Sequence, residues 1–293
     1  MSGSRVLIGA FVALLACMPA AAAAAGKPTA PDTGSDRAGA VTVNGLRMYV
    51  EEHGSGPPLL LLHGGGSTAQ SSFGAIMPVL ARTHHVIAPE QQAHGHSGDR
   101  PGPLSFEQMA DDTAALLAKL GVAETDVLGF SNGGIVAMQL AIRHPRLVRR
   151  LILCSSFYGR SAMPPQFWQG FAHATMADMP PPLRAAFIAA APNQAEVPAR
   201  FAKQVALMDS FRDIPEASLR GIAVKSLVMV GDHDVMSVEH VGQLSRLLRH
   251  GELAVMPGSG HGTYLGAVEG ARPGSPLMGL GVTMIEAFLA GTL

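Results

Sequence analysis

The sequence predicts an α/β fold with a mostly parallel central sheet and helices on both faces. Short, continuous apolar segments recur along the 293-residue chain, and segments with helical periodicity separate most of them. These predicted strands begin at Pro58, His85, Asp126, Leu151, Ser226 and Glu252. The interval 157–222 interrupts the alternation and is divided by proline pairs and triplets. We therefore expect a helical cap inserted after the sixth strand, counting the two strands of a hairpin that precedes Pro58.

The N-terminus has the organisation of a signal peptide over residues 1–25. Arg5 supplies a positive charge, Val6 to Cys17 is apolar, and small residues up to Ala25 offer cleavage sites. The apolar stretch is too short to span a bilayer. We expect an exported protein, periplasmic or secreted, with no integral membrane span.

Two features complete this interpretation of the N-terminal region. Leu14 to Cys17 resembles a bacterial lipobox, so lipid anchoring at Cys17 is the alternative to cleavage near Ala25. Residues 26–40, rich in Pro, Thr, Asp, Ser and Gly, predict a flexible leader. The folded domain is then expected to cover residues 41–293.

Local patterns predict the first elements of that domain. Val41–Val50 has an Asn-Gly pair at its centre, which is typical of a β-hairpin. Ser105 opens a capping-box pattern that is completed by Gln108. The helix that follows is expected to end before Gly121.

Composition limits the classes of partner. Hydrophobic residues make up 47% of the chain, enough for a sizeable core. The net charge of −1, from 21 Lys and Arg against 22 Asp and Glu, gives no electrostatic basis for nucleic-acid binding. A neutral small molecule is the expected partner. Of the two cysteines, Cys17 leaves with a cleaved signal, and Cys154 lies on an apolar strand, where we interpret it as a buried structural thiol rather than a nucleophile.

The pentapeptide Gly129-Phe130-Ser131-Asn132-Gly133 lies between a predicted strand and a predicted helix. A reversal this tight strains the serine backbone and requires small residues two positions before and after it. It exposes the Ser131 Oγ and directs the Asn132 N–H toward charge that develops beside it. An ordinary glycine-rich loop is the alternative interpretation.

A second glycine-rich loop, His63-Gly64-Gly65-Gly66, follows the strand Pro58 to Leu62. Its backbone can pass close to a bound carbonyl group and present N–H groups to it, as the second half of an oxyanion hole. A phosphate-binding P-loop is the alternative, but no Lys-Ser or Lys-Thr pair follows the glycines.

An activated serine requires a histidine base and a carboxylate that orients it. Asp232-His233-Asp234 follows the strand Ser226 to Gly231, and His261 lies in the loop after the next strand. The order serine, aspartate, histidine is that of α/β-hydrolases. Asp232 remains the alternative acid. A metal site built on Asp232-His233-Asp234 is the other alternative, although no second cluster at metal spacing accompanies it, and no metal or cofactor is expected.

These four motifs, in this order, resemble the α/β-hydrolase superfamily, as a capped serine esterase-like member, from about Val41 to the C-terminus. The resemblance implies that Ser131 is the nucleophile, His261 the general base and then acid, and Asp234 the orienting acid. It also implies that Gly65 and Asn132 supply the N–H groups of the oxyanion hole. No cofactor is implied.

One loop departs from the family pattern. Many members carry Asp-x-x-Gly-x-Gly-x-Ser after the fourth strand, and here the segment reads Glu90-Gln91-Gln92-Ala93-His94-Gly95-His96-Ser97. Glu90 and Ala93 are the changed positions. The departure leaves the superfamily assignment standing and weakens any transfer of a subfamily's substrate.

The predicted cap contains Phe157, Trp168, Phe171, Met176 and Met179. These side chains are expected either to line an apolar acyl or alcohol pocket or to form the cap's own small core, and methionines and aromatic residues serve both purposes.

The expected function is hydrolysis of a carboxylic ester of a small, largely apolar substrate through an acyl-enzyme. Cleavage of a C–C bond, a lactone or an amide by the same three residues is the alternative. A non-catalytic, receptor-like binding protein is a further class, but the intact set of Ser131, Asp234 and His261 argues against it.

Overall fold

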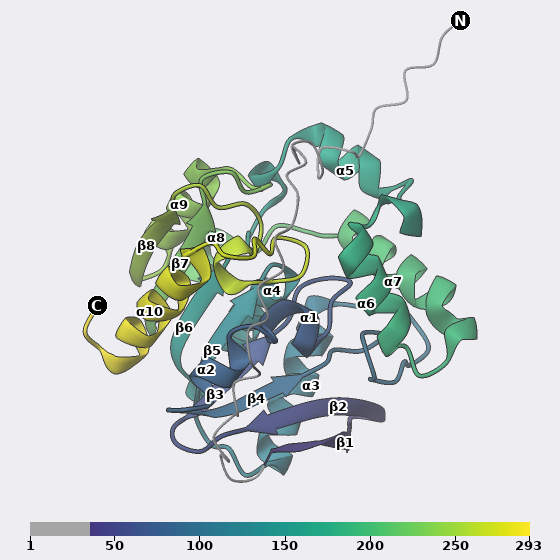
Figure 1. The fold of residues 1–293 in the computed structure, drawn as a ribbon, viewed down its shortest axis with the longest axis horizontal. Helices are drawn as coiled ribbons and strands as arrows, with labels where there is room; N and C mark the ends of the chain where they lie inside the picture. Colours follow the sequence, from purple (N-terminus) through teal and green to yellow (C-terminus); the bar gives the residue numbers. More distant parts are fainter. Residues whose placement is uncertain (1–35) are drawn as a thin grey trace, which may run out of the picture.

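The computed structural model describes residues 36–293, so the expected signal peptide and most of the expected leader lie outside the described residues. Within this part of the chain, eight strands form one sheet in the order β1-β2-β4-β3-β5-β6-β7-β8 (Figure 1). The strands are β1 Arg37–Val43, β2 Leu46–His53, β3 Pro58–Leu62, β4 His85–Pro89, β5 Thr125–Phe130, β6 Val148–Cys154, β7 Lys225–Gly231 and β8 His250–Met256.

The sheet is antiparallel at one edge and parallel elsewhere. β1 pairs with β2 and β2 with β4 in antiparallel register, and every other neighbouring pair of strands is parallel. The predicted mostly parallel sheet is therefore confirmed. Parallel strands end at the same edge, so the loops that follow β3, β5, β6 and β7 lie next to one another there.

Two corrections concern the first strand and the first long helix. β1 begins at Arg37, inside the segment predicted as leader to residue 40, because Arg37 pairs with Glu52 at the far end of the longer strand β2. The Asn44-Gly45 turn between the strands has positive φ at both residues, as predicted. In the other case, Ser105 caps the helix α3 (Phe106–Lys119) by accepting from the Gln108 N–H, but the reciprocal bond of the capping box is absent from the hydrogen bonds of the described chain.

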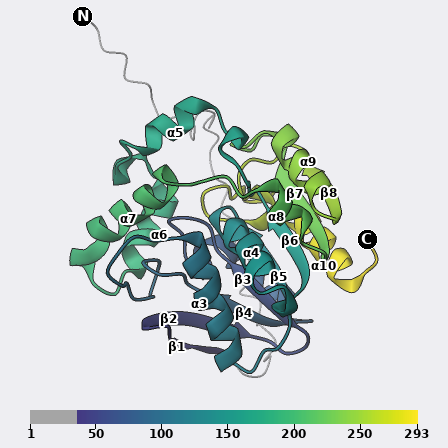
Figure 2. The same ribbon diagram turned by 180° about the vertical axis from the view of Figure 1, so that it is seen from behind.

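Helices cover both faces of the sheet (Figures 1 and 2). The core helices are α1 Ala69–Phe73, α2 Met77–Leu80, α3 Phe106–Lys119, α4 Asn132–Arg143, α9 Val238–Leu247 and α10 Leu277–Ala290. Alternate residues of one strand enter different cores: Leu60 and Leu62 pack with α3 and α4, whereas Leu59 and Leu61 pack with α1, α2 and α10. Burial on both faces explains why the strands are continuously apolar.

The predicted cap lies between β6 and β7. It contains α5 Pro165–Phe171, α6 Pro181–Ala190, α7 Val197–Asp209 and α8 Glu216–Arg220, with 3₁₀ turns at Arg160–Ala162, Met176–Asp178 and Gln194–Glu196. Proline stands in the first turn of α5, α6 and α7, where its missing N–H costs no hydrogen bond. Prolines therefore begin the cap helices as well as separating them.

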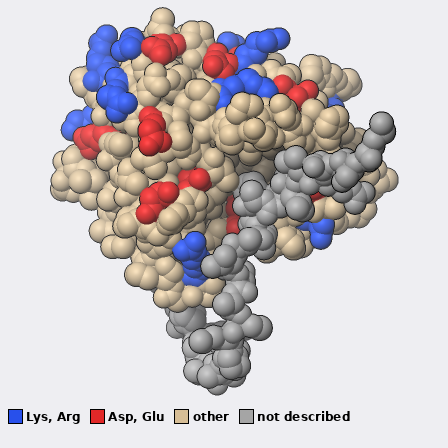
Figure 3. Space-filling view, turned by 90° about the horizontal axis from the view of Figure 1, so that it is seen from above, with Lys and Arg blue, Asp and Glu red and all other residues tan. Residues whose placement is uncertain are grey.

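Side chains of both charge signs are interspersed over the face of the molecule seen from above in Figure 3. Within the described residues, no helix is both long and apolar enough to cross a membrane.

Candidate active site

Ser131 stands alone between β5 and α4 with φ 54° and ψ −121°, a strained conformation for a residue with a side chain. Glycines make the turn sterically feasible. A Cβ at Gly133 would overlap the Leu62 carbonyl oxygen, and one at Gly129 would lie 2.6 Å from the Gly134 Cα. The structure thus gives the physical reason for glycine two residues before and two residues after Ser131.

Ser131, His261 and Asp234 form one chain of hydrogen bonds. The Ser131 Oγ lies 3.2 Å from His261 Nε2, and His261 Nδ1 lies 2.8 Å from Asp234 Oδ1. An ionised carboxylate only accepts hydrogen bonds, so Nδ1 carries the proton and Nε2 is left to accept from the serine. The Phe130 ring, with its centroid 4.9 Å from that of His261, covers one side of the imidazole.

The two candidate acids have different partners. Asp234 contacts His261, and its side chain is fully buried. Asp232 is 37% exposed and accepts a hydrogen bond of 3.1 Å from the Ser259 N–H, which ties the loop after β8 to the loop after β7. In residues 36–293, no group of three or more His, Cys, Asp and Glu side chains is arranged to hold a metal ion.

The electrostatics of the hydrogen-bond chain through Ser131, His261 and Asp234 favour an ionised Asp234 and a basic His261. Burial tends to raise the pKa of Asp234, but the charge of His261 and the hydrogen bonds to the carboxylate hold it below its usual value. Burial likewise tends to lower the pKa of His261, but Asp234 and a second carboxylate, Glu269, hold it above its usual value. Burial raises the pKa of Glu269 itself. Its Oε2 is buried without a hydrogen-bond partner among the described residues.

Gly65 and Asn132 lie together at the predicted oxyanion site. The Asn132 side chain packs so closely on Gly65 that a Cβ there would overlap the Asn132 amide nitrogen. Among the hydrogen bonds of the described chain, the backbone N–H groups of Gly65 and Asn132 have no acceptor. Both N–H groups remain available to a ligand oxygen.

His63 holds the glycine loop after β3 in place through both of its ring nitrogens. Burial lowers its pKa to about 3, so the ring is neutral at pH 7. Its Nδ1 lies 2.8 Å from the Gly64 carbonyl oxygen, and its Nε2 accepts a 3.0 Å hydrogen bond from the Gln91 N–H. The histidine therefore links the glycine loop after β3 to the loop after β4.

The loop that departs from the family pattern is where the cap attaches. Ala93 has φ 60°, a conformation that favours glycine, so its side chain is held at a strained position. From α7, Gln204 donates to the Ala93 carbonyl oxygen at 3.1 Å, and Arg200 donates to the Gly95 carbonyl oxygen at 3.1 Å. Glu90 holds the loop from within by accepting from the His96 N–H at 2.6 Å.

The predicted pocket residues lie mainly in the cap's core. Phe157 and Trp168 are buried and pack with Phe211, and the Trp168 Nε1 donates to the Arg160 carbonyl oxygen at 2.8 Å. Phe171 is half-buried against the same cluster. All three therefore contribute to an apolar core, which is one of the two expected destinations, and their role in lining the substrate pocket stays a prediction.

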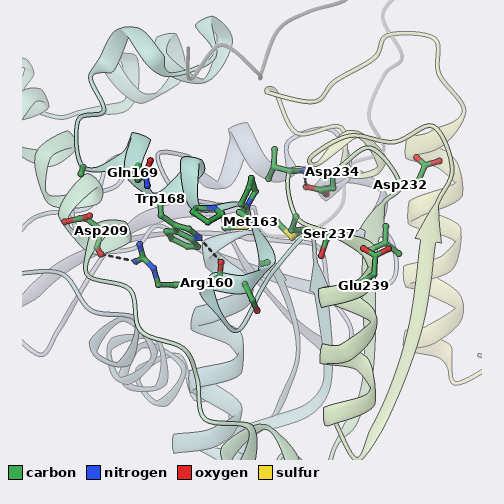
Figure 4. A pocket seen from close by; sticks show the side chains of 17 residues that line it. Arg160, Met163, Trp168, Gln169, Asp209, Asp232, Asp234, Ser237 and Glu239 are labelled. Atoms are coloured by element: carbon green, nitrogen blue, oxygen red, sulfur yellow. Dashed lines mark hydrogen bonds between the residues drawn. The ribbon is translucent and has the colours of Figure 1, made fainter. Parts of the chain in front are cut away.

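A cavity of about 1030 Å³ lies between α5 and the loop after β7 (Figure 4). Trp168 and Met163 line it from the cap, and Asp234 and Ser237 line it from the core. Neither Ser131 nor His261 lines it. The cavity therefore flanks the acid and does not open over the serine. Two cap residues lie near the oxyanion loop: the Met179 Cε is 3.1 Å and the Gln204 Oε1 3.6 Å from where a Cβ at Gly66 would be.

Sequence reasoning missed several residues that support the site. Ser155 bonds to Asp234, and Ser156 donates to the Ser131 carbonyl oxygen at 2.9 Å. The Tyr264 hydroxyl lies 2.9 Å from the Ser155 Oγ, and the Glu269 carboxylate helps to raise the pKa of His261. The one available signal was two polar residues directly after β6, the strand next to the one that carries Asp234. Cys154 is fully buried, and burial raises the pKa of its thiol, as expected of a structural residue.

A family model described as the alpha/beta hydrolase fold matches residues 57–220, more than half of the chain. The chain belongs to the α/β-hydrolase family. It is 35% identical over 131 residues to 2-hydroxymuconate semialdehyde hydrolase of Pseudomonas sp. strain CF600, a match that covers 43% of this chain and 46% of that protein. The matched regions thus span less than half the length of such curated relatives.

Solved structures of the family align over most of the chain. Est816, described as an N-acyl homoserine lactone degrading enzyme, has a TM-score of 0.66 at 26% identity, covering 87% of this chain and 100% of that one. A thermophilic esterase from Thermogutta terrifontis has a TM-score of 0.70 at 22% identity, covering 88% and 99%. The relatives are hydrolases with different substrates, which supports a hydrolase without specifying the bond.

Proposed function

We propose that this α/β-hydrolase is a serine hydrolase that cleaves a carboxylic ester of a small, largely apolar substrate. The observation that carries the proposal is the unbroken hydrogen-bond chain from the Ser131 Oγ through His261 to the buried Asp234 carboxylate. A serine held in a strained turn beside a basic imidazole is the arrangement that nucleophilic catalysis requires.

The geometry suggests how each group would act. His261 Nε2 takes the Ser131 proton as Oγ attacks the ester carbonyl carbon, and Asp234 stabilises the imidazolium that forms. The N–H groups of Gly65 and Asn132 bind the resulting oxyanion, each contributing about 3 kcal/mol to lowering the barrier. His261 then gives the proton to the leaving alcohol. Water activated by the same ring hydrolyses the acyl-enzyme, which releases the acid.

Labelling with a fluorophosphonate tests the nucleophile directly. One equivalent of probe should attach to Ser131, and Ser131→Ala should abolish both labelling and turnover of a short-chain aryl ester. Ser218→Ala, at a half-buried serine on α8 without a side-chain hydrogen bond in the described structure, is the matched control and should retain both. Labelling that survives Ser131→Ala, or a wild-type protein that neither reacts nor turns over any ester, would contradict the proposal.

The bond that is cleaved is proposed separately from the mechanism. C–C, lactone or amide hydrolysis uses the same three residues, so a panel of purified substrates of each type discriminates between them. We favour the ester because its hydrolysis needs no group beyond the three residues and the two oxyanion N–H groups already described. Faster turnover of a lactone, an amide or a C–C substrate than of every ester would reassign the substrate class and leave the nucleophile unchanged.

Export is proposed from the N-terminal sequence alone. If the signal peptide is cleaved, the N-terminus of the protein recovered from a bacterial host should map between Ala20 and Lys27. A diacyl or triacyl mass at Cys17, with activity in the membrane fraction, would instead indicate lipid anchoring.

A further inference from the structure

The two oxygens of the Asp234 carboxylate have separate hydrogen-bond partners. Oδ1 accepts from His261 Nδ1 at 2.8 Å and from the Val235 N–H at 2.7 Å. Oδ2 accepts from the Ser155 Oγ at 2.6 Å, which is the one hydrogen bond that this oxygen makes within residues 36–293. Because the Asp234 side chain is fully buried, water does not replace a missing partner easily.

Ser155 is held in place by its backbone. It follows the last residue of β6 and has φ 47°, as Ser131 has φ 54° after β5. The Ser131 N–H donates to the Cys154 carbonyl oxygen at 2.9 Å, and the Ser155 N–H donates to that of Met229 at 2.8 Å. Two neighbouring parallel strands therefore end in the same way. Each places a serine directly after its last residue, at the edge of the sheet where Asp234 lies.

The Ser155 hydroxyl is also held from its other side. The Tyr264 hydroxyl lies 2.9 Å from the Ser155 Oγ and 3.0 Å from the Met229 carbonyl oxygen. A carboxylate is the stronger acceptor, so the Ser155 proton points to Asp234. The single Tyr264 hydroxyl proton is then shared between the Met229 carbonyl oxygen and the Ser155 Oγ. Tyr264 remains protonated, because burial raises its pKa well above the usual value. Ser155 and Tyr264 are both fully buried, so bulk water does not compete for these hydrogen bonds.

We propose that Ser155 is a positioning residue of the active site, which orients the Asp234 carboxylate toward His261, while Tyr264 fixes the Ser155 hydroxyl. The proposal rests on the proposed serine-hydrolase function. The ionisable groups that act on this carboxylate or on its direct partners are His261 and Tyr264, with Cys154 acting on Tyr264 and Glu269 on His261. Of these only His261 can become positive, which it does on taking the Ser131 proton, so in the resting site the hydrogen bonds from His261, Ser155 and Val235 compensate for burial of the carboxylate.

The test uses two substitutions at the same position. Ser155→Ala and Ser155→Gly both remove the hydroxyl, but at φ 47° glycine relieves backbone strain that alanine retains. Loss of a hydrogen bond to a charged group predicts that kcat falls about 10- to 100-fold in both variants, with KM nearly unchanged. The glycine variant should nevertheless melt at a higher temperature than the alanine variant. Equal kcat losses at unequal stability would separate positioning from a merely structural role.

Two further variants sharpen the comparison. Tyr264→Phe leaves the bond from Ser155 to Asp234 in place, so its loss of kcat should be smaller than that of Ser155→Ala. Ser226→Ala removes a similarly buried hydroxyl, which bonds to the Val224 carbonyl oxygen at 3.1 Å at the opposite end of β7. This control should lower the melting temperature and leave kcat unchanged.

A spectroscopic readout does not depend on turnover. The His261 Nδ1 proton, shared with Asp234, should give a far-downfield proton resonance that moves upfield or disappears in both Ser155 variants and persists in Ser226→Ala. Folded Ser155 variants with the wild-type resonance and kcat within threefold of wild type would overturn the proposal, as would kcat values that follow the melting temperatures. Failure of the serine-hydrolase function itself would appear instead as a wild type without labelling or turnover.

Discussion

Replacing Asp234 by asparagine removes the negative charge beside His261 and changes the shape of the residue very little. Both carboxylate oxygens accept hydrogen bonds, Oδ1 from His261 and Val235 and Oδ2 from Ser155. An amide has one acceptor oxygen, so it must turn an N–H toward a group that now donates to the carboxylate. Whichever way the amide turns, its N–H group faces one of the donors that the carboxylate accepts from, so the hydrogen bonds around His261 are no longer complementary. The ring is then no longer fixed with its proton on Nδ1.

The size of the effect follows from the geometry. His261 becomes positive as it takes the serine proton, and the buried carboxylate lies in direct contact with it. Two unit charges roughly 4 Å apart at an effective dielectric constant of about 20 interact by about 4 kcal/mol, which corresponds to about 10³ in rate. Misorientation of the ring adds to this loss. We therefore expect Asp234→Asn to lower kcat by about three to four orders of magnitude with little change in KM.

Steady-state turnover of an aryl ester measures this effect, with Asp232→Asn as the matched control. Asp232 is partly exposed, and an asparagine oxygen can still accept the Ser259 N–H. Its kcat should remain within about threefold of wild type, as is usual for surface substitutions. The reasoning fails if Asp234→Asn retains more than a tenth of the wild-type kcat, and the reverse ranking of the two variants would transfer the role to Asp232.

Three further predictions follow from the same geometry. Glu269→Gln removes one of the two carboxylates that hold the pKa of the active-site histidine up, so the acidic limb of kcat/KM should move to lower pH in a pH-rate profile; an unmoved limb would contradict this. Gly133→Ala should lower the free energy of unfolding by about 3 kcal/mol or more in a denaturant melt, whereas Gly279→Ala, at an open position of α10, should raise it by up to about 1 kcal/mol. Similar effects of the two substitutions would refute the steric argument. Trp168→Ala should lower the free energy of unfolding by about 3 to 5 kcal/mol and leave the preference for acyl-chain length unchanged. Met179→Ala should alter that preference at nearly unchanged stability, and the opposite pattern would show that Trp168 lines the pocket.

The parts of the site that lie at strand ends were predictable because their requirements are local in sequence. Ser131 needs glycines at fixed offsets, and a Cβ at Gly133 would strike the strand next to it. The strands are recognisable because burial on both faces demands continuous apolar residues. Strand order, however, depends on pairing between distant segments. This is also why β1 extends to Arg37, where pairing with β2 outweighs a composition that predicts a leader.

The support of the acid was not predictable in the same way. Ser155, Tyr264 and Met229 come from three separate segments, and each contributes one atom to a single hydrogen-bond chain. Serine, tyrosine and a backbone carbonyl carry no spacing signal, because their partners are fixed by the packing of β6, β7 and the loop after β8. Only the position of Ser155, directly after a strand that neighbours β7, indicated that its side chain lies near Asp234.

The cap was harder to predict than the strand ends, because its apolar side chains can either line the substrate pocket or form the cap's own core. Phe157 and Trp168 pack on Phe211 at one end of the cap, where they hold it together. At the other end, polar groups of α7 bind backbone carbonyl oxygens of the loop after β4, through Gln204 and Arg200. That loop also contacts the glycine loop through His63. The segment in which this chain departs from the family pattern is thus the one that seats the cap beside Gly65, and we expect substrate preference to depend on this contact more than on the aromatic content of the cap.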